Sequence, residues 1–246
     1  MIGVSTVGAN SATAANHGDP WTTMVVVDDP VAGELLRHYR TTSESGQPAQ
    51  LLGEMPIAGA SEVVAEADGS AVWVLGSGSA PGASRIERFA VAADGSLTAT
   101  GEAFDVGEGA RDLVRSPDDR HVYTVNPDAN TLTAVDTIAG TVDAFAIPGG
   151  PIGIVVAPDG VTAAVITEDD IVHRVDLVTG AVTATRAAGG GFTAEGLVDI
   201  ELAPEGDAVY IAADGGSGGG AVTRLRLDAA LSVEGFLAPN RLDPGF

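Results

Sequence analysis

Four residues occupy equivalent positions in a repeated sequence pattern, and three of them carry side chains that can bind a metal ion or act in acid–base chemistry. Glu62, Asp112, Gly153 and Asp199 each precede a turn-forming acidic residue by the same interval. Three of the four are carboxylates, and carboxylates held close together repel one another unless something neutralises them. Ca²⁺ suits such a set, because it takes about six to eight oxygen ligands. We therefore predict a Ca²⁺ site formed by Glu62, Asp112 and Asp199; the alternative is that they only solvate a water-filled opening.

A second group of polar residues is predicted beside the carboxylates. Arg111 adjoins Asp112 and can bind a carboxylate or phosphate group of a ligand, or pair with a neighbouring acidic residue. Further acidic residues fall in predicted turns, including the segment "TEDDI" at 167–171. Such turns are often only solvated, because exposed connections tolerate charge. The predicted ligand-binding residues are Arg111, Asp128, Asp169 and Asp170.

The catalytic residues stay unknown at this point. The four histidines form no HxxxH or triad-like spacing, and the chain has no cysteine. The segment "GSGSAPG" at 76–82 resembles a phosphate-binding loop only in its glycine content, and it precedes a predicted strand. We therefore predict no phosphate site in that segment.

Composition limits the partners. All 12 basic residues are arginine, and with 34 acidic residues the net charge is -22. Nucleic acid and anionic membrane surfaces are poor partners for this chain, because its charge would repel their phosphate groups. A small molecule, a cation or a basic protein surface remains, with the chain expected to be a monomer. Without cysteine there are no disulfides, and no apolar run approaches the ~20 residues of a membrane span. We favour an extracellular or periplasmic location slightly over a cytoplasmic one.

The chain repeats itself. "SPDD" at 116–119 recurs as "APDG" at 157–160, as "APEG" at 203–206 and more weakly as "EADG" at 66–69. The acidic residues Asp68, Asp118, Asp159 and Glu205 lie 50, 41 and 46 positions apart. Each is followed by a short apolar run, a turn, an alternating segment, another turn and a further strand-like segment. Period-two alternation and β-branched residues favour strands over helices.

A repeat of about 40–50 residues with four strands fits a blade of a β-propeller. We predict an all-β fold, a β-propeller of four-stranded antiparallel blades with about five blades in this chain. It forms a single domain, 1–246, with blades at about 1–57, 58–103, 104–147, 148–187 and 188–246. Residues 2–15 are expected to supply the innermost strand of the first blade and to close the ring.

The stretch "SPDDRHVYTVNPDANTLTAVDTIAGTV" at 116–142 resembles the YVTN repeat of bacterial and archaeal β-propellers, and "VDLVTGAV" at 175–182 repeats its second half. Propellers similar to this one include surface proteins, binding proteins and lactonases of the phosphogluconolactonase type. The lactonase propellers usually have seven blades, whereas about five are predicted here. The resemblance therefore implies the fold and leaves the function open.

The repeat also predicts how the blades pack. Trp73 should be at least half buried, and the sheets should enclose Val122, Tyr123, Val125, Val135, Ile154, Val156, Val209, Ile211 and Leu225. Arg88, Arg174 and Arg224 occupy equivalent positions of the third strands. We expect each of these arginines to pair with a carboxylate of a neighbouring blade.

Two functions fit the sequence. The first is a non-enzymatic module that binds a ligand, a cation or a protein through an acidic face. The second is a lactonase-type hydrolase, in which Glu62, Asp112 and Asp199 hold a divalent metal whose bound water attacks the lactone and Arg111 polarises the carbonyl group. The binding module is favoured, because no dedicated acid–base pair is visible.

Overall fold

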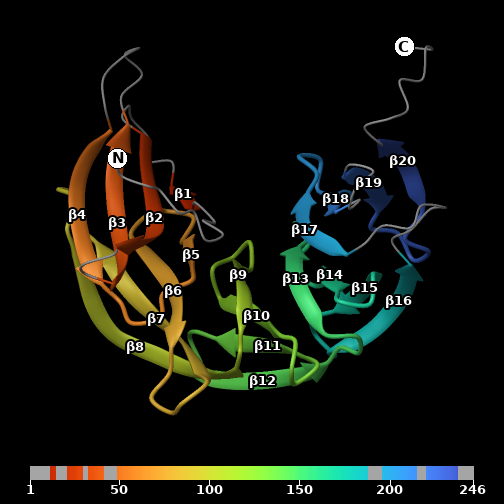
Figure 1. Cartoon of the computed structure of the whole chain (residues 1–246), viewed down its shortest axis with the longest axis horizontal. Coiled ribbons are helices and arrows are strands. Elements are labelled where there is room, and N and C mark those ends of the chain that lie inside the picture. Colours follow the sequence, from red (N-terminus) through yellow and green to blue (C-terminus); the bar gives the residue numbers. More distant parts are fainter. Residues whose placement is uncertain are drawn as a thin grey trace. The chain divides into compact units, whose positions relative to one another are not determined.

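The regular secondary structure of the described residues consists of strands joined by turns. The computed structural model describes residues 12–14, 21–29, 33–41, 49–187, 196–214 and 220–237. Within these ranges it contains twenty strands and no helix (Figure 1). The strands form five four-stranded antiparallel sheets, in each of which the strands lie in sequence order. This confirms the prediction of an all-β fold built from four-stranded antiparallel blades.

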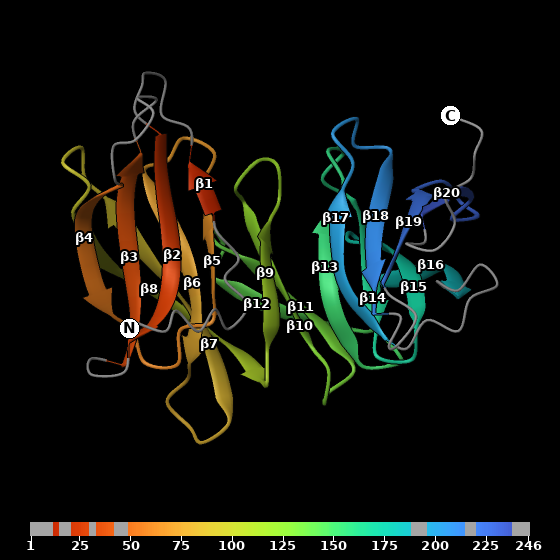
Figure 2. The same cartoon turned by 45° about the horizontal axis from the view of Figure 1, so that its top comes forward.

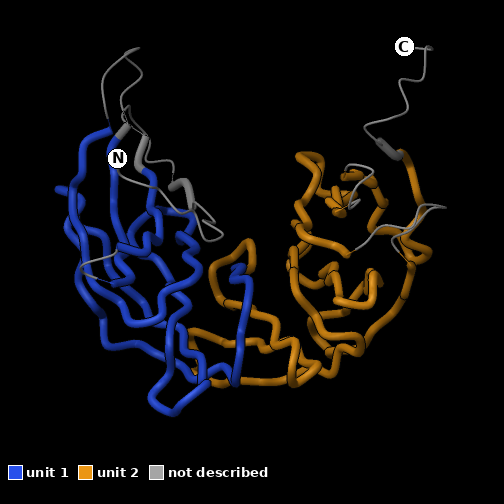
Figure 3. Tube along the Cα trace, in the orientation of Figure 1, with its two compact units in different colours: residues 1–115 blue, residues 116–246 orange. Residues whose placement is uncertain are grey.

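By its internal contacts the chain divides into two compact units, residues 1–115 and 116–246 (Figure 3). Unit 1 contains the first two sheets. The first sheet consists of β1 (Ala12–Ala14), β2 (Trp21–Asp29), β3 (Gly33–Thr41) and β4 (Gln50–Pro56), which run side by side in Figure 2. The second sheet consists of β5 (Glu62–Ala65), β6 (Ala71–Ser77), β7 (Ala83–Val91) and β8 (Leu97–Glu108).

The remaining three sheets follow in chain order. The third consists of β9 (Arg111–Arg115), β10 (His121–Asn126), β11 (Thr131–Asp136) and β12 (Thr141–Ala146). The fourth consists of β13 (Pro151–Val156), β14 (Thr162–Thr167), β15 (Ile171–Asp176) and β16 (Ala181–Ala187). The fifth consists of β17 (Leu197–Leu202), β18 (Ala208–Ala213), β19 (Ala221–Arg226) and β20 (Val233–Leu237).

The five sheets end at Pro56, Glu108, Ala146, Ala187 and Leu237. The prediction departs most between the second and third sheets, where a boundary at 103/104 falls inside β8, which ends at Glu108. β1 pairs with β2, so residues 12–14 do supply the innermost strand of the first sheet. The rest of residues 2–15 lies outside the described residues, and the closure of the ring and the single domain stay predictions.

The repeated acidic residue is explained by the turn between the first and second strands of each sheet. Oδ1 of Asp118 accepts a hydrogen bond from the backbone N–H of Arg120 at 3.1 Å, and Oδ1 of Asp68 accepts one from Ser70 at 2.8 Å. The hydrogen bond from Oγ of Ser116, followed by the one from Arg120, lowers the pKa of Asp118. The hydrogen bond from the backbone N–H of Ser70 lowers the pKa of Asp68 in the same way. The next residue adopts a left-handed conformation each time: Gly69, Asp119, Gly160 and Gly206 have φ of 70°, 58°, 70° and 75°. The anchor is therefore a turn-forming device.

The apolar faces of the strands form the core of each unit. In unit 1 a cluster that includes Met24, Leu36, Val72 and Phe89 packs the first sheet against the second. In unit 2 a cluster around Ile166, Ile200 and Ile211 joins the fourth and fifth sheets. Trp73 is 1% exposed, which confirms its predicted burial. All of the predicted core residues are buried except Val156, which is partly exposed.

The pairing predicted for the third-strand arginines is wrong. Arg88 binds Glu66 at 2.6 Å and Glu102 at 3.0 Å, and both acidic residues belong to its own sheet or to its turns. Arg224 pairs with Glu234 on β20, again in its own sheet. The side chains of neighbouring strands in one sheet stand only about 5 Å apart. A long arginine therefore reaches a carboxylate of the next strand before one of the next sheet.

Candidate functional site

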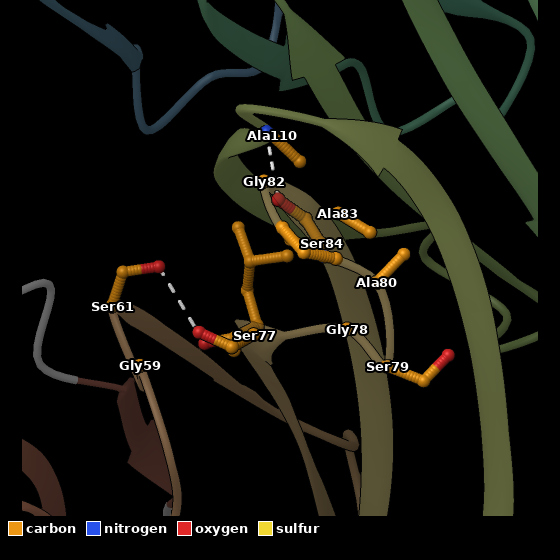
Figure 4. A pocket seen from close by; sticks show the side chains of 13 residues that line it. Gly59, Ser61, Ser77, Gly78, Ser79, Ala80, Gly82, Ala83, Ser84 and Ala110 are labelled. Carbon is orange, nitrogen blue, oxygen red and sulfur yellow. Dashed lines mark hydrogen bonds between the residues drawn. The ribbon is translucent and has the colours of Figure 1, made fainter.

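A cavity of about 460 Å³ lies in unit 1 where three connections meet. They are the turn from β4 to β5, the hairpin from β6 to β7 and the turn from β8 to β9 (Figure 4). The lining residues are Gly59, Ser61, Leu75, Gly76, Ser77, Gly78, Ser79, Ala80, Pro81, Gly82, Ala83, Ser84 and Ala110. None of these described residues is charged, although the chain as a whole carries a net charge of -22.

Glycines allow the backbone segments around this cavity to come close together. Gly59 has φ of +63°, and a Cβ there would stand 1.9 Å from Oγ of Ser77. A Cβ on Gly78 would stand 2.9 Å from Cβ of Ala83. Side chains at these two positions would collide with the opposite wall, so the glycines set the shape of the cavity.

Serine hydroxyls give the cavity its polar groups. Oγ of Ser61 donates to the carbonyl oxygen of Leu75 at 3.5 Å, and Oγ of Ser84 accepts from the backbone N–H of Ala110 at 3.0 Å (Figure 4). The hydroxyls of Ser77 and Ser79 make no hydrogen bond within the described part of the chain. These two hydroxyls can bind the hydroxyl or carbonyl groups of a ligand.

Two predicted site regions adjoin this cavity. Glu62 begins β5, directly after the lining residue Ser61, and Oε2 of Glu62 is buried. Arg111 begins β9, directly after the lining residue Ala110, and its side chain is exposed. β5 and β9 are in contact as the innermost strands of consecutive sheets. Unit 1 therefore places a half-buried carboxylate and an exposed guanidinium at the same end of adjacent strands.

The equivalence of Asp112, Gly153 and Asp199 is visible in the backbone. Asp112 has φ of +53°, a left-handed conformation that few residues other than glycine, asparagine and aspartate adopt. Gly153 and Asp199 each follow a β-bulge, at 151–153 and 197–199. Bulges redirect side chains and are common next to binding sites. The three residues thus share an irregular position at the start of an innermost strand.

The predicted metal site stays a prediction. Glu62 and Asp112 belong to unit 1 and Asp199 to unit 2. Asp199 is exposed, and its Oδ1 accepts from the N–H of Ile200 at 2.9 Å. Burial, followed by the charge of Asp199, raises the pKa of Glu201. Across the residues that the structure describes, no group of three or more metal-ligating side chains is found.

The acidic turn residues have partly structural roles. Asp170, with φ of +63°, accepts on Oδ1 from the N–H of Leu197 at 3.1 Å, where the fifth sheet begins. Asn130 holds the equivalent place one sheet earlier: its φ is +54°, and its Oδ1 accepts from the N–H of Gly150 at 2.9 Å. We call these two contacts the turn clips, because each ties a sheet of unit 2 to the start of the next.

The other two predicted ligand-binding residues differ from Asp170. Oδ1 of Asp169 accepts from Oγ1 of Thr167 at 2.5 Å within its own turn. Asp128 is exposed in the turn between β10 and β11. Ligand binding by Asp128, Asp169 and Asp170 stays a prediction.

Sequence reasoning missed the residues that line the cavity. The sequence predicts no phosphate site at 76–82, because the segment precedes a strand, whereas in the structure this segment forms one wall of the cavity. The sequence feature that could have indicated this cavity is the high content of glycine and serine in the connection between the second and third strands. That connection opens at the same end as the innermost strands that begin with Glu62 and Arg111.

Comparison with known proteins identifies the fold. No family model and no curated protein matches the chain, so the resemblance to the YVTN repeat stays an interpretation of its sequence. Solved structures do match. A "putative 6-phosphogluconolactonase" from Bacteroides uniformis has a TM-score of 0.72 at 19% identity, over 95% of this chain and 72% of that one. Another from Bacteroides fragilis has a TM-score of 0.67 at 17% identity, over 88% of this chain and 68% of that one.

Proposed function

We propose that this chain is a hydrolase of sugar lactones that acts at the cavity between β5, β6, β7 and β9. The observation that carries the proposal is the position of Glu62 and Arg111 beside a neutral, hydroxyl-lined cavity. The fold that presents them is shared with two proteins that are each described as a "putative 6-phosphogluconolactonase". At identities of 19% and 17%, that likeness concerns the fold, and the activity rests on the site.

Lactone hydrolysis needs a base, a water molecule and a group that stabilises negative charge. Glu62 takes a proton from water, and the hydroxide equivalent attacks the acyl carbon. Arg111 stabilises the oxyanion that develops on the carbonyl oxygen. The acyl–oxygen bond of the ring then breaks, the ring oxygen takes up the proton, and a hydroxy acid leaves. Each step uses groups from the same end of unit 1.

The lining of the cavity favours a polyhydroxylated substrate. Ser77 and Ser79 offer hydroxyls, and the lining carries no acidic side chain that would repel an anion. A lactone bearing a phosphate group can also use Arg111, because a guanidinium binds phosphate oxygens in pairs. We therefore expect sugar lactones as substrates, with 6-phosphogluconolactone the first to test.

The alternative of a binding module that uses an acidic face has no specific observation in its favour. The cavity that adjoins the predicted residues is neutral. A divalent metal at Glu62, Asp112 and Asp199 is not needed for the proposed steps and stays a separate proposal. The monomeric state and the location also stay predictions. Among the described residues, no helix is long and apolar enough to cross a membrane.

The test is a pH-stat assay on 6-phosphogluconolactone and on unphosphorylated gluconolactone, with the spontaneous rate subtracted. Glu62→Gln should lower kcat by about a hundredfold or more, which is typical of losing a general base. Arg111→Ala should raise KM more for the phosphorylated lactone than for the other. Asp105→Asn, which removes an exposed carboxylate on β8, is the matched control and should leave both constants unchanged. Absence of any rate above the spontaneous one would end the proposal.

A further inference from the structure

The third strands carry a repeated arginine that one sheet lacks. In four sheets, an arginine on the third strand lies directly opposite a residue of the second strand. The pairs are Val25 and Arg37, Trp73 and Arg88, Ala164 and Arg174, and Tyr210 and Arg224. At the same place in the third sheet, Tyr123 pairs with Ala134. Four sheets therefore place an arginine where the third sheet has an alanine.

In three sheets this arginine binds a carboxylate on the fourth strand. Nε of Arg37 lies 3.2 Å from Oε2 of Glu54, which stands directly opposite on β4. Nη1 of Arg88 lies 3.0 Å from Oε2 of Glu102 on β8. Arg224 pairs with Glu234 on β20. In the fourth sheet, where β16 offers no acid, Arg174 binds Oγ1 of Thr183 at 2.9 Å.

An aromatic ring on the second strand completes this arrangement in the fifth sheet. The guanidinium carbon of Arg224 lies 5.8 Å from the centre of the Tyr210 ring. A guanidinium over an aromatic face gains from the electrostatics of the ring, and its flat shape stacks on it. The arginine is thus held between an aromatic ring on one side and a carboxylate on the other.

The third sheet retains both partners without the arginine. Asp143 stands directly opposite Ala134 on β12, and Tyr123 stands opposite Ala134 on β10. Asp143 is exposed and pairs with no other side chain in the described part of the chain. The nearby Arg120 is engaged with Asp136, its Nε at 3.1 Å and its Nη2 at 2.9 Å from Oδ2.

A groove opens where the arginine is missing. Its volume is about 490 Å³, and the third sheet contributes Tyr123, Ala134, Asp143 and Phe145 to its lining. The fourth sheet supplies the other wall through Asp159, Val161, Leu177 and Val178. The lining also contains Arg120, His121, Asp118 and Asp136, so its acidic side chains still outnumber its basic ones. All of these residues belong to unit 2.

Tyr123 is a second, independent feature of the groove. Its side chain is 3% exposed, and its hydroxyl makes no hydrogen bond to any described residue. Burial, followed by the charges of Asp118 and Asp136, raises the pKa of Tyr123 to about 12, so the phenol stays neutral. The hydroxyl oxygen can accept a hydrogen bond from an N–H group of a ligand.

We propose that this groove binds the guanidinium group of a ligand, in the place that arginine fills in the other sheets. Asp143 supplies the carboxylate, and Tyr123, whose ring is stacked with the ring of His121, supplies an aromatic surface and a hydroxyl acceptor. A guanidinium fits better than an ammonium, because it is planar and can donate to a carboxylate and stack on a ring at once. The site is separate from the proposed lactonase cavity, whose residues all lie in unit 1.

The first test is calorimetry with agmatine, which carries a guanidinium, against N-carbamoylputrescine, its urea analogue, at low salt. Agmatine should bind at least about tenfold more tightly, since a hydrogen bond to a charged group contributes about 1.5–3 kcal/mol. Asp143→Asn should weaken agmatine binding by about tenfold or more. Asp105→Asn, the same loss of charge on β8, should change nothing. Equal binding of the two compounds, or unchanged binding by Asp143→Asn, would overturn the proposal.

A second variant fills the groove from within. Ala134→Arg restores the arginine of the other sheets and should abolish agmatine binding while the circular dichroism spectrum stays that of the wild type. Undiminished binding by a folded Ala134→Arg would also overturn the proposal. A blocked Gly-Arg-Gly tripeptide identifies the source of the guanidinium: tighter binding than agmatine assigns it to a peptide, and weaker binding assigns it to a small molecule.

Discussion

The imidazole of His173 donates from Nε2 to the carbonyl oxygen of Pro148, 3.1 Å away, and so links β15 to the turn that precedes β13. A carbonyl oxygen only accepts, so Nε2 carries the proton. Nδ1 then accepts from Oγ1 of Thr185 at 3.0 Å. The ring is 4% exposed, and burial lowers its pKa from the usual 6.5. The folded protein therefore holds His173 in its neutral form.

This predicts a pH-dependent stability. Because the folded pKa of His173 lies below that of the unfolded chain, its contribution is complete above about pH 6.5 and is lost as the pH falls below that value. His173→Gln retains an amide donor but does not titrate. Urea unfolding at pH 7.5 and 5.5 should show a smaller loss of unfolding free energy in this variant than in the wild type. Equal losses would contradict the assignment.

The core of the fifth sheet gives a stability prediction. Ile211 is 1% exposed within the cluster that joins the fourth and fifth sheets. Ile211→Ala should cost about 2–4 kcal/mol, because it removes buried methylene groups and leaves a cavity. Val198→Ala, at a 61% exposed bulge position, is the control and should change the unfolding free energy by less than about 0.5 kcal/mol. Similar losses in both variants would mean that the strand faces are inverted.

Glu66 should contribute more to the free energy of unfolding than an ordinary surface carboxylate does. It accepts from Nε and Nη2 of Arg88 at 2.6 and 2.8 Å and from Nε1 of the buried Trp73 at 3.2 Å. Glu66→Gln keeps the shape but removes the charge, and it should lower the unfolding free energy by about 1–3 kcal/mol. Glu168→Gln, at an exposed turn, is the comparison. A loss no larger than that of Glu168→Gln would show that the Arg88 pair is screened by solvent.

The calcium prediction is tested by titration calorimetry. If Glu62, Asp112 and Asp199 bind a cation together, Ca²⁺ should bind more tightly than Zn²⁺, because only oxygen ligands are on offer. Asp112→Asn should weaken Ca²⁺ binding, and it preserves the backbone, since asparagine also tolerates the φ of +53°. Identical Ca²⁺ binding by the variant, or none by the wild type at about millimolar Ca²⁺, would remove the metal site.

The fold was predictable because its information is local. The acid at Asp68, Asp118 or Asp159 forms a turn through its own backbone hydrogen bonds, and alternation then sets the strands on either side. Such signals lie within a few residues of each other. The sequence therefore carries the strand order and the burial of residues such as Trp73.

The arginine pairs and the cavity could not be predicted in the same way. Whether Arg88 reaches Glu66 or a carboxylate of another sheet depends on the lengths and directions of side chains across a twisted sheet. The cavity near Gly59 and Gly78 depends on how closely separate turns approach each other. Neither property has a periodic signal, and glycine and serine occur in most turns.

The turn clips have a consequence for how such a chain evolves. Asn130 binds the N–H of Gly150, which directly precedes β13, and Asp170 binds the N–H of Leu197, which begins β17. In each turn clip the acceptor is a side-chain oxygen of one repeat, and the donor is a backbone N–H at the start of the next repeat. A duplicated segment therefore brings with it the side-chain acceptor that binds the start of the repeat after it.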